Sequence, residues 1–95
     1  MDIETAVKIT TAIRYNWKRW NDLQRADAIL LLRNEGESQR TLAKIAGCSE
    51  GLIRHIEIVG RLPNSWKQLL LDGHSTRKVV KAWRAQQKQQ RQQRH

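Results

Sequence analysis

A chain of 95 residues has room for one small domain, and a chain of this size buries only about two thirds of its unfolded surface. Its start, MDIETAVK, lacks the apolar stretch of a secretory signal, and no apolar run approaches the roughly 18 residues that span a membrane. The single cysteine, Cys48, excludes an internal disulfide and favours a reducing cytoplasm.

The formal net charge of +9 is concentrated in the last third of the chain. Residues 61–95 hold nine basic residues and one acidic residue, a net charge of +8. Residues 1–23 hold four basic and three acidic residues, and residues 24–60 hold five of each sign. Such a one-sided excess indicates a polyanionic partner, of which nucleic acid is the commonest and an anionic membrane surface the next. A basic end that only improves solubility is the alternative.

Neither alternating strand patterns nor hairpin dipeptides occur, so the sequence predicts an all-α fold of five to six short helices. The first helix is expected over residues 2–20, with Asp2 as its N-cap and Asn21-Asp22 as its end. Its apolar stripe recurs at steps of three and four residues and contains Ile3, Ala6, Val7, Thr10, Ile13, Trp17 and Trp20.

The next two helices are shorter. A second helix fits residues 23–34, and Gly36 just past its end favours a left-handed stop. Its expected inward residues are Ala26, Ile29, Leu30 and Leu32. Ser38 can cap a third helix that runs to about Ala46.

Three more helices follow in the second half of the chain. Ser49 caps a fourth, which ends at Gly60 and whose expected buried residues are Leu52, Ile53, Ile56 and Val59. The stretch LPNSWKQLLLDG predicts a fifth, with Pro63 near its first turn and Gly73 at its end. Ser75 caps a sixth, with an apolar stripe of Val79, Val80 and Trp83 and, mainly on the other side, the cations Arg77, Lys78, Lys81, Arg84 and Lys88.

These elements predict one helical domain over residues 1–85. From Gln86 the chain contains only Gln, Arg and Lys before the final His95. With no apolar residue to bury, the basic tail of residues 86–95 is expected to be disordered or a frayed extension of the sixth helix.

The stretch TLAKIAGCSEGLIRHI, residues 41–56, joins two of these helices very tightly. A small residue, Ala43, stands where such helices would cross, and Gly47 supplies a turn residue that tolerates positive φ. Ser49 caps the second helix directly after the turn. The inner faces are apolar, with Leu42, Ala46, Cys48, Ile53 and Ile56. The sequence therefore predicts a helix-turn-helix over residues 39–59.

If this motif binds DNA, its second helix enters the major groove by its N-terminal end. We call the outward residues there, Ser49, Glu50, Gly51, Arg54 and His55, the leading edge; Ile58 is a further candidate. Arg54 can grip guanine O6 and N7, but contact with a phosphate or with solvent remains an alternative. His55 can donate to a base or a phosphate, and Glu50 can accept from cytosine N4. Gly51 either permits close backbone approach or is simply tolerated in the first turn.

Phosphate contacts are expected at two other places. Ser38, Gln39 and Arg40, at the front of the preceding helix, are placed to hold a phosphate. Arg77, Lys78 and Lys81 are expected to contact the DNA backbone and to add salt-sensitive affinity.

Residues 22–84 resemble the central DNA-binding domain of the ParB/KorB family of chromosome- and plasmid-partition proteins. The resemblance is carried by Leu42-Ala43, by Gly47 with Ser49, and by the run 60–63 (GRLP), which leads to a short helix closed by Asp72-Gly73. It implies that the region 38–59 inserts into the DNA groove and that the later helices brace it and touch the backbone. Residues carried over on this basis are Gln39, Arg40, Ser49, Gly51, Arg54 and His55.

The chain also departs from that family. Nothing before Leu23 resembles the family's N-terminal nucleotide-binding domain with its Gly-rich, Arg-containing motif, so no nucleotide cofactor or clamp behaviour is implied. There is no room for the family's separate C-terminal dimerisation domain. A standalone regulator or accessory DNA binder therefore fits better than partition itself.

Other chemistry finds little support. The tryptophans of YNWKRW could stack on the bases of a single-stranded nucleic acid. We favour instead burial in a core or a subunit interface for all four tryptophans, Trp17, Trp20, Trp66 and Trp83. His55, His74, His95 and Cys48 lack zinc-ligand spacing, and no acidic pair suits acid–base catalysis. We expect no enzyme activity and no metal or other cofactor.

The favoured function is sequence-specific binding of double-stranded DNA by a cytoplasmic, nucleoid-associated regulator of transcription or of a replicon. A homodimer formed through the first helix is expected, because pairing doubles the DNA contacts; a membrane partner is not. Two alternatives stay open: an RNA-binding protein that uses the basic tail and the Trp residues, and a protein–protein adaptor of a larger DNA-processing enzyme.

Overall fold

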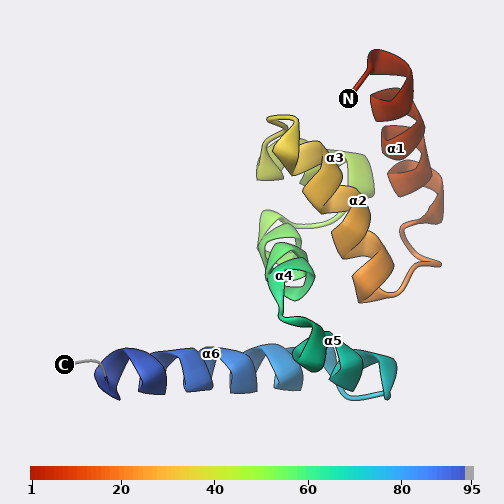
Figure 1. The fold of residues 1–95 in the computed structure, drawn as a ribbon. Helices are drawn as coiled ribbons and strands as arrows, with labels where there is room; N and C mark the ends of the chain where they lie inside the picture. Colours follow the sequence, from red (N-terminus) through yellow and green to blue (C-terminus); the bar gives the residue numbers. More distant parts are fainter. Residues whose placement is uncertain (94–95) are drawn as a thin grey trace. The chain divides into compact units, whose positions relative to one another are not determined.

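The computed structural model describes residues 1–93, and all of its regular structure in that range is helical (Figure 1). Six helices and no strand occur in this part of the chain, as the sequence predicted. They are α1 (Ile3–Asn16), α2 (Asp22–Asn34), α3 (Gln39–Ala46), α4 (Glu50–Arg61), α5 (Asn64–Leu71) and α6 (Thr76–Gln93).

The helices belong to two compact units. The first unit comprises Met1–Gly60 and contains α1 to α3 and nearly all of α4. The second begins at Arg61 and contains α5 and α6, which pack against each other. Each unit is described by itself below.

Helix α1 is shorter than the predicted helix over residues 2–20. Asp2 is its N-cap as predicted, accepting a hydrogen bond from the Thr5 backbone N–H at 2.7 Å. The regular helix ends at Asn16, and Trp17 is its C-cap. Beyond Asn16 the chain turns. The Arg19 N–H donates to the Asn16 carbonyl at 2.9 Å, and the Trp17 carbonyl accepts from Arg25 Nε of the next helix.

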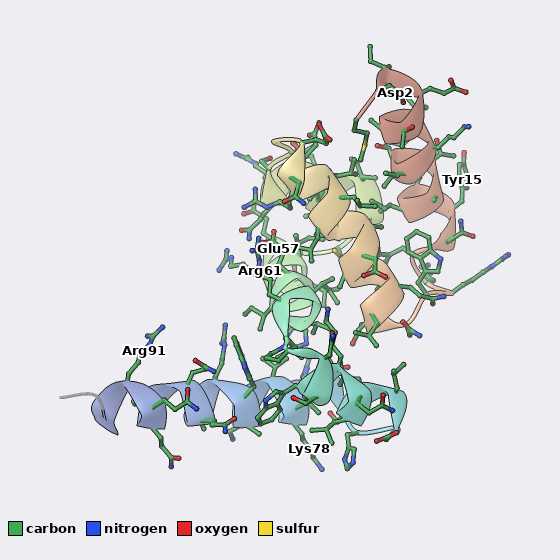
Figure 2. All side chains as sticks on the ribbon, in the orientation of Figure 1. Asp2, Tyr15, Glu57, Arg61, Lys78 and Arg91 are labelled. Carbon is green, nitrogen blue, oxygen red and sulfur yellow. The ribbon has the colours of Figure 1, made fainter. Side chains whose placement is uncertain are left out.

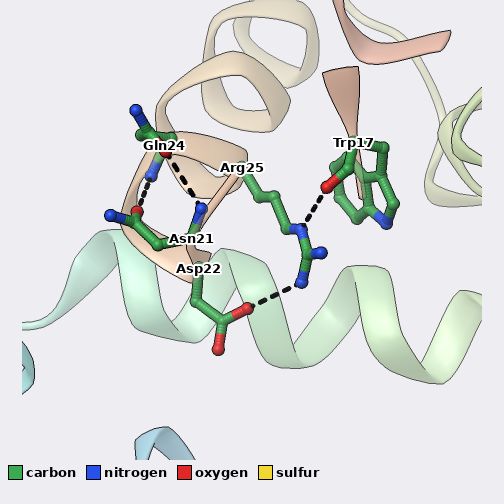
Figure 3. A network of polar contacts seen from close by, with 5 residues as sticks. All are labelled: Trp17, Asn21, Asp22, Gln24 and Arg25. Carbon is green, nitrogen blue, oxygen red and sulfur yellow. Dashed lines mark hydrogen bonds and ion pairs between the residues drawn. The ribbon is translucent and has the colours of Figure 1, made fainter. Parts of the chain in front are cut away.

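A cluster of polar contacts fixes this corner between α1 and α2 (Figure 3). Arg25 donates from Nε to the Trp17 carbonyl at 2.8 Å and from Nη1 to Asp22 at 3.1 Å, and its guanidinium lies over the Trp17 ring. Asn21 and Gln24 form a reciprocal capping box that starts α2 one residue before the predicted position. These contacts satisfy backbone groups that the broken helix would otherwise leave free.

The predicted apolar stripe of the first helix is buried only in its second half. Ile13 and Trp17 are buried, whereas Ile3 is 84% exposed and Val7 is 57% exposed. Helix α1 packs against α2 and α3. Trp20, expected in a core or interface, is half-buried.

Helices α2, α3 and α4 supply most of the first unit's core. The fully or nearly fully buried side chains are Ala26, Ala28, Ile29, Leu32, Leu42, Ala43, Ile53, Ile56 and Val59. The sequence predicted most of these residues, but the predicted inward residues Leu30 and Leu52 are half-buried. Gly36 ends the α2 region with φ +96°, which confirms the predicted left-handed stop.

Gly60 lies inside α4, although the sequence predicted it as the helix end. A Cβ atom added there would stand 2.5 Å from Leu30 Cδ1 and 3.0 Å from the Ala26 Cβ. The missing side chain therefore lets α4 approach α2 closely, and the helix continues to Arg61.

The second unit is built on two helices. Pro63 precedes α5 without a side-chain cap, and Ser75 precedes α6, where its carbonyl accepts the Val79 N–H at 3.0 Å. Leu62, Val79 and Val80 are buried, whereas the predicted core residues Trp66 and Trp83 are half-buried. Helix α6 continues through the predicted tail from Gln86 to Gln93; Arg94 and His95, the last residues of that tail, lie outside the described residues.

Candidate nucleic-acid interface

The turn between α3 and α4 consists of Gly47, Cys48 and Ser49. Gly47 adopts φ +74° and ψ +36°, and both its N–H and that of Cys48 donate to the Ala43 carbonyl, at 2.9 and 3.0 Å. A side chain at this φ would be strained, which explains the glycine. The turn closes α3 and reverses the chain within three residues.

Both helices of this pair begin with the predicted serine caps. Ser38 Oγ accepts the Thr41 N–H at 3.0 Å, and Ser49 Oγ accepts the Leu52 N–H at 3.1 Å. Each serine thus satisfies one backbone donor of the first helical turn. Ser49 Oγ does not bind the other backbone N–H groups in the first turn of α4. Free N–H groups at the N-terminus of a helix favour a bound anionic group.

The leading edge of α4 is largely open to solvent. Ser49, Glu50, Gly51 and Arg54 are exposed, and His55 is half-buried, as is Ile58. Arg54 has no carboxylate within ion-pair distance among residues 1–93. Its guanidinium therefore keeps all its donors available for an external acceptor.

The side of α4 opposite Arg54 is buried in the core. Ile53, Ile56 and Val59 are fully buried. Since residues three and four apart share a helix face, these side chains fix which face of α4 is presented outward. The rotation of the helix about its axis is thus set by packing.

The front of α3 divides the three residues predicted to hold a phosphate. Ser38 and Arg40 are exposed. Gln39 is half-buried, and its Nε2 donates to Glu57 Oε1 of α4 at 3.2 Å. Gln39 therefore links the two helices, a role that the sequence prediction did not include.

Glu57 is a buried polar residue of this helix pair that the sequence did not predict. It is only 7% exposed, and Figure 2 labels it on α4. The same Oε1 atom that accepts from Gln39 lies 2.8 Å from Arg33 Nε of α2. The Nε–H does not point at the oxygen well enough for a hydrogen bond, so the Arg33 contact is an ion pair. One carboxylate therefore ties α4 to both α2 and α3.

A sequence signal for this residue was present. Within the stretch LIRHIEIV, Glu57 directly follows the buried Ile56 and lies four residues after the buried Ile53 on the same helical face. A carboxylate next to the buried face of a helix needs a cation or a hydrogen-bond donor as its partner. Arg33, on α2, is such a cation.

Cys48, which the sequence placed on the apolar inner face of the motif, is half-buried. Burial raises the pKa of its thiol, although the nearby Arg25 charge opposes this. A thiol shifted in this direction is less ionised at neutral pH, which is the reverse of what a nucleophile needs. No group of three or more His, Cys, Asp and Glu residues suited to a metal ion occurs within residues 1–93.

The predicted backbone-contacting cations Arg77, Lys78 and Lys81 lie on α6 in the second unit, and all three are exposed. They form the candidate surface of the second unit. None of the described helices has the length and apolar character needed to cross a membrane.

Comparison with protein-family models, with curated proteins and with solved structures finds no match for this chain.

Proposed function

We propose that this protein binds double-stranded DNA in a sequence-specific manner, with α3 and α4 acting as a helix-turn-helix. The observation that carries the proposal is the leading edge of α4, where an unpaired, exposed Arg54 stands on a helix whose opposite face is fully packed. An arginine held on a rigid element can read guanine through two parallel hydrogen bonds.

In this proposal the parts of the α3–α4 pair have distinct roles. Arg54 reads a base edge, and His55 donates to a base or a phosphate. Exposed Arg40, with the Ser38 end of α3, holds a backbone phosphate and so fixes the register on the duplex. Gly51 leaves space beside the backbone, since the nearest atom to an added Cβ would be Ser49 Oγ at 3.8 Å.

Glu57 supports this arrangement from inside the protein. By contacting Arg33 and Gln39 it connects α4 to the two preceding helices. A recognition helix tied at its centre keeps its leading edge in one orientation, and pre-organised contacts lose less entropy on binding. We assign Glu57 a positioning role without contact to DNA.

The same proposal includes the resemblance to the ParB/KorB central domain. It also includes a cellular role: the protein acts on the nucleoid in the cytoplasm as a regulator of transcription or of a replicon. Residues 38–59 would insert into the groove.

We extend the proposal to a homodimer that uses α1. The exposed Ile3 and Val7 are apolar side chains on a helix whose apolar stripe is buried only in its second half, and a second copy would cover them. Sedimentation should show a dimer at tens of micromolar protein, and Ile3→Lys/Val7→Lys should convert it to a monomer. A strictly monomeric protein with and without DNA would contradict this part.

A direct test of the main proposal compares nucleic acids at equal ionic strength. Fluorescence anisotropy with labelled duplex DNA and with single-stranded RNA should show tighter binding to the duplex. Arg54→Ala should weaken binding to a preferred duplex more than to a scrambled one. Tighter binding to the RNA, or equal losses on both duplexes, would reject the proposal.

A further inference from the structure

Five cations of α6 form a continuous row. Arg77, Lys81, Arg84, Lys88 and Arg91 follow one another at steps of four, three, four and three residues, and all are exposed. At 3.6 residues per turn these positions fall within a sector of about 80°, and the row is about 21 Å long. We call these five residues the cationic row.

The row borders the packed side of α6, since the buried Val80 stands three residues after Arg77 and four before Arg84. Val79 and Val80 are buried, and Trp83 is half-buried. Lys78 does not belong to the row, and Figure 2 shows Lys78 and Arg91 on opposite sides of the helix. The charge on α6 is therefore concentrated on one face.

Nothing on α6 neutralises the row. The helix contains no Asp or Glu, and none of its cations forms an ion pair within the described part of the chain. Like charges three and four residues apart destabilise a helix, and Arg77 stands in the first turn, where the helix dipole disfavours a cation. A surface helix selected only for stability would alternate its charges.

The distal half of the row has no packing to support it. Between Gln86 and Arg91 the side chains are Gln, Lys and Arg, and no apolar residue is available for burial. Self-repulsion there would be relieved by a polyanion that runs parallel to the helix axis. Duplex DNA carries one negative charge per about 1.7 Å of its axis, so a row about 21 Å long meets a high density of phosphates.

We propose that the cationic row is a second binding surface, which holds the phosphate backbone of duplex DNA without regard to sequence and independently of α4. The choice of duplex DNA as the polyanion rests on the proposed function. The row supplies affinity for any duplex, while α4 discriminates among sequences.

The test measures binding to a scrambled duplex of about two helical turns between 50 and 200 mM salt. The row variant is Lys81→Gln/Arg84→Gln/Lys88→Gln in the full chain. The control, Lys8→Gln/Arg14→Gln/Lys18→Gln, removes the same charge from exposed cations of the first unit. Circular dichroism of each variant confirms that the helices remain.

The slope of log affinity against log salt should fall by about 2.7 in the row variant, because each engaged phosphate contributes about 0.9. The control should keep the slope of the unmodified protein. An unchanged slope in the row variant, or an equal fall in the control, would overturn the proposal. Tighter binding of the row to single-stranded RNA than to the duplex at equal salt would also overturn the proposal.

The two proposals fail in different ways. A protein that binds scrambled duplex through the row but prefers no sequence supports the row and rejects the role of α4. A protein in which Arg54→Ala abolishes binding to scrambled duplex has no independent row, and this outcome rejects the inference drawn from α6.

Discussion

Arg33 and Glu57 face each other across the α2–α4 contact, with Nε of the arginine 2.8 Å from Oε1 of the carboxylate. They are 24 positions apart in the sequence, and Glu57 is buried while the Arg33 side chain is 34% exposed. Gln39 adds a hydrogen bond to the same oxygen. The pair therefore joins three helices at one point behind the leading edge of α4.

Removing the arginine should leave a buried carboxylate with a single partner. Arg33→Ala is expected to lower the free energy of unfolding by about 1–3 kcal/mol, less than for a fully buried pair because solvent reaches the arginine. Urea unfolding measures this value. The control is Arg40→Ala, an exposed cation without an ion-pair partner among the described residues, which should change it by less than about 0.5 kcal/mol.

A double-mutant cycle with Glu57→Ala isolates the interaction. The coupling energy between Arg33 and Glu57 should lie between about 0.5 and 3 kcal/mol. Additive effects would show that the two side chains do not depend on each other, and Glu57 would then lose its proposed positioning role.

Two glycines of α4 should respond to alanine in opposite directions. At Gly51 an added methyl meets no close atom, so Gly51→Ala should raise the free energy of unfolding by up to about 1 kcal/mol. At Gly60 the methyl would collide with Leu30, so Gly60→Ala should lower it by about 1–3 kcal/mol. Thermal unfolding of both variants provides the comparison.

The same Gly51 variant also tests the DNA proposal. If the α4 backbone approaches the groove at this position, Gly51→Ala should weaken duplex binding while it stabilises the free protein. Improved stability with unchanged affinity would mean that the glycine is simply tolerated in the first turn.

The cap of α4 should matter both for stability and for binding. Ser49→Ala removes the acceptor of the Leu52 N–H and is expected to lower the free energy of unfolding by about 1 kcal/mol. Ser49→Asp keeps an acceptor and should preserve stability, but its charge should oppose a nearby phosphate. Chemical unfolding and duplex titration of both variants separate the two effects.

The stability of α1 should depend on pH through its cap. The Thr5 side chain and the Thr5 backbone N–H hold the pKa of Asp2 below its ordinary value of 3.8. A lowered pKa in the folded state means that the stabilisation is complete above the unfolded-state pKa and is lost as pH falls through the folded-state pKa.

Helix content should therefore fall as the pH drops below about 4. Asp2→Asn keeps a capping oxygen that does not titrate, and it should remove the part of the pH dependence that comes from α1. Circular dichroism across this pH range provides the measurement. Identical acid profiles for the two proteins would show that the cap does not contribute.

Local sequence rules predicted the parts of this fold that depend on local chemistry. The caps at Asp2, Ser38 and Ser49 and the left-handed Gly47 turn were predictable because each needs one residue type at one position. The buried faces of α2 and α4 followed from helical periodicity in the same way.

Contacts between distant segments were not predictable from such rules. The early end of α1 depends on Arg25 reaching back to Trp17, and the continuation of α4 through Gly60 depends on its closeness to Leu30. Single-residue propensity would end both helices elsewhere, and tertiary contact decides the outcome.

The candidate site shows the same division. The exposure of Arg54 followed from the helical pattern, because apolar residues fill the opposite face. The pairing of Glu57 with Arg33 and Gln39 joins three helices, and its partners became clear only from the folded arrangement.

The central claim is that the leading edge of α4 reads a base pair through Arg54. The most direct measurement is selection of bound sequences from a random pool of duplexes, performed in parallel with the unmodified protein and with Arg54→Ala. The unmodified protein should enrich a defined motif, and Arg54→Ala should lose the preference at one base pair and keep the others. Enrichment of the same motif by both proteins, or of no motif by the unmodified protein, would contradict the account.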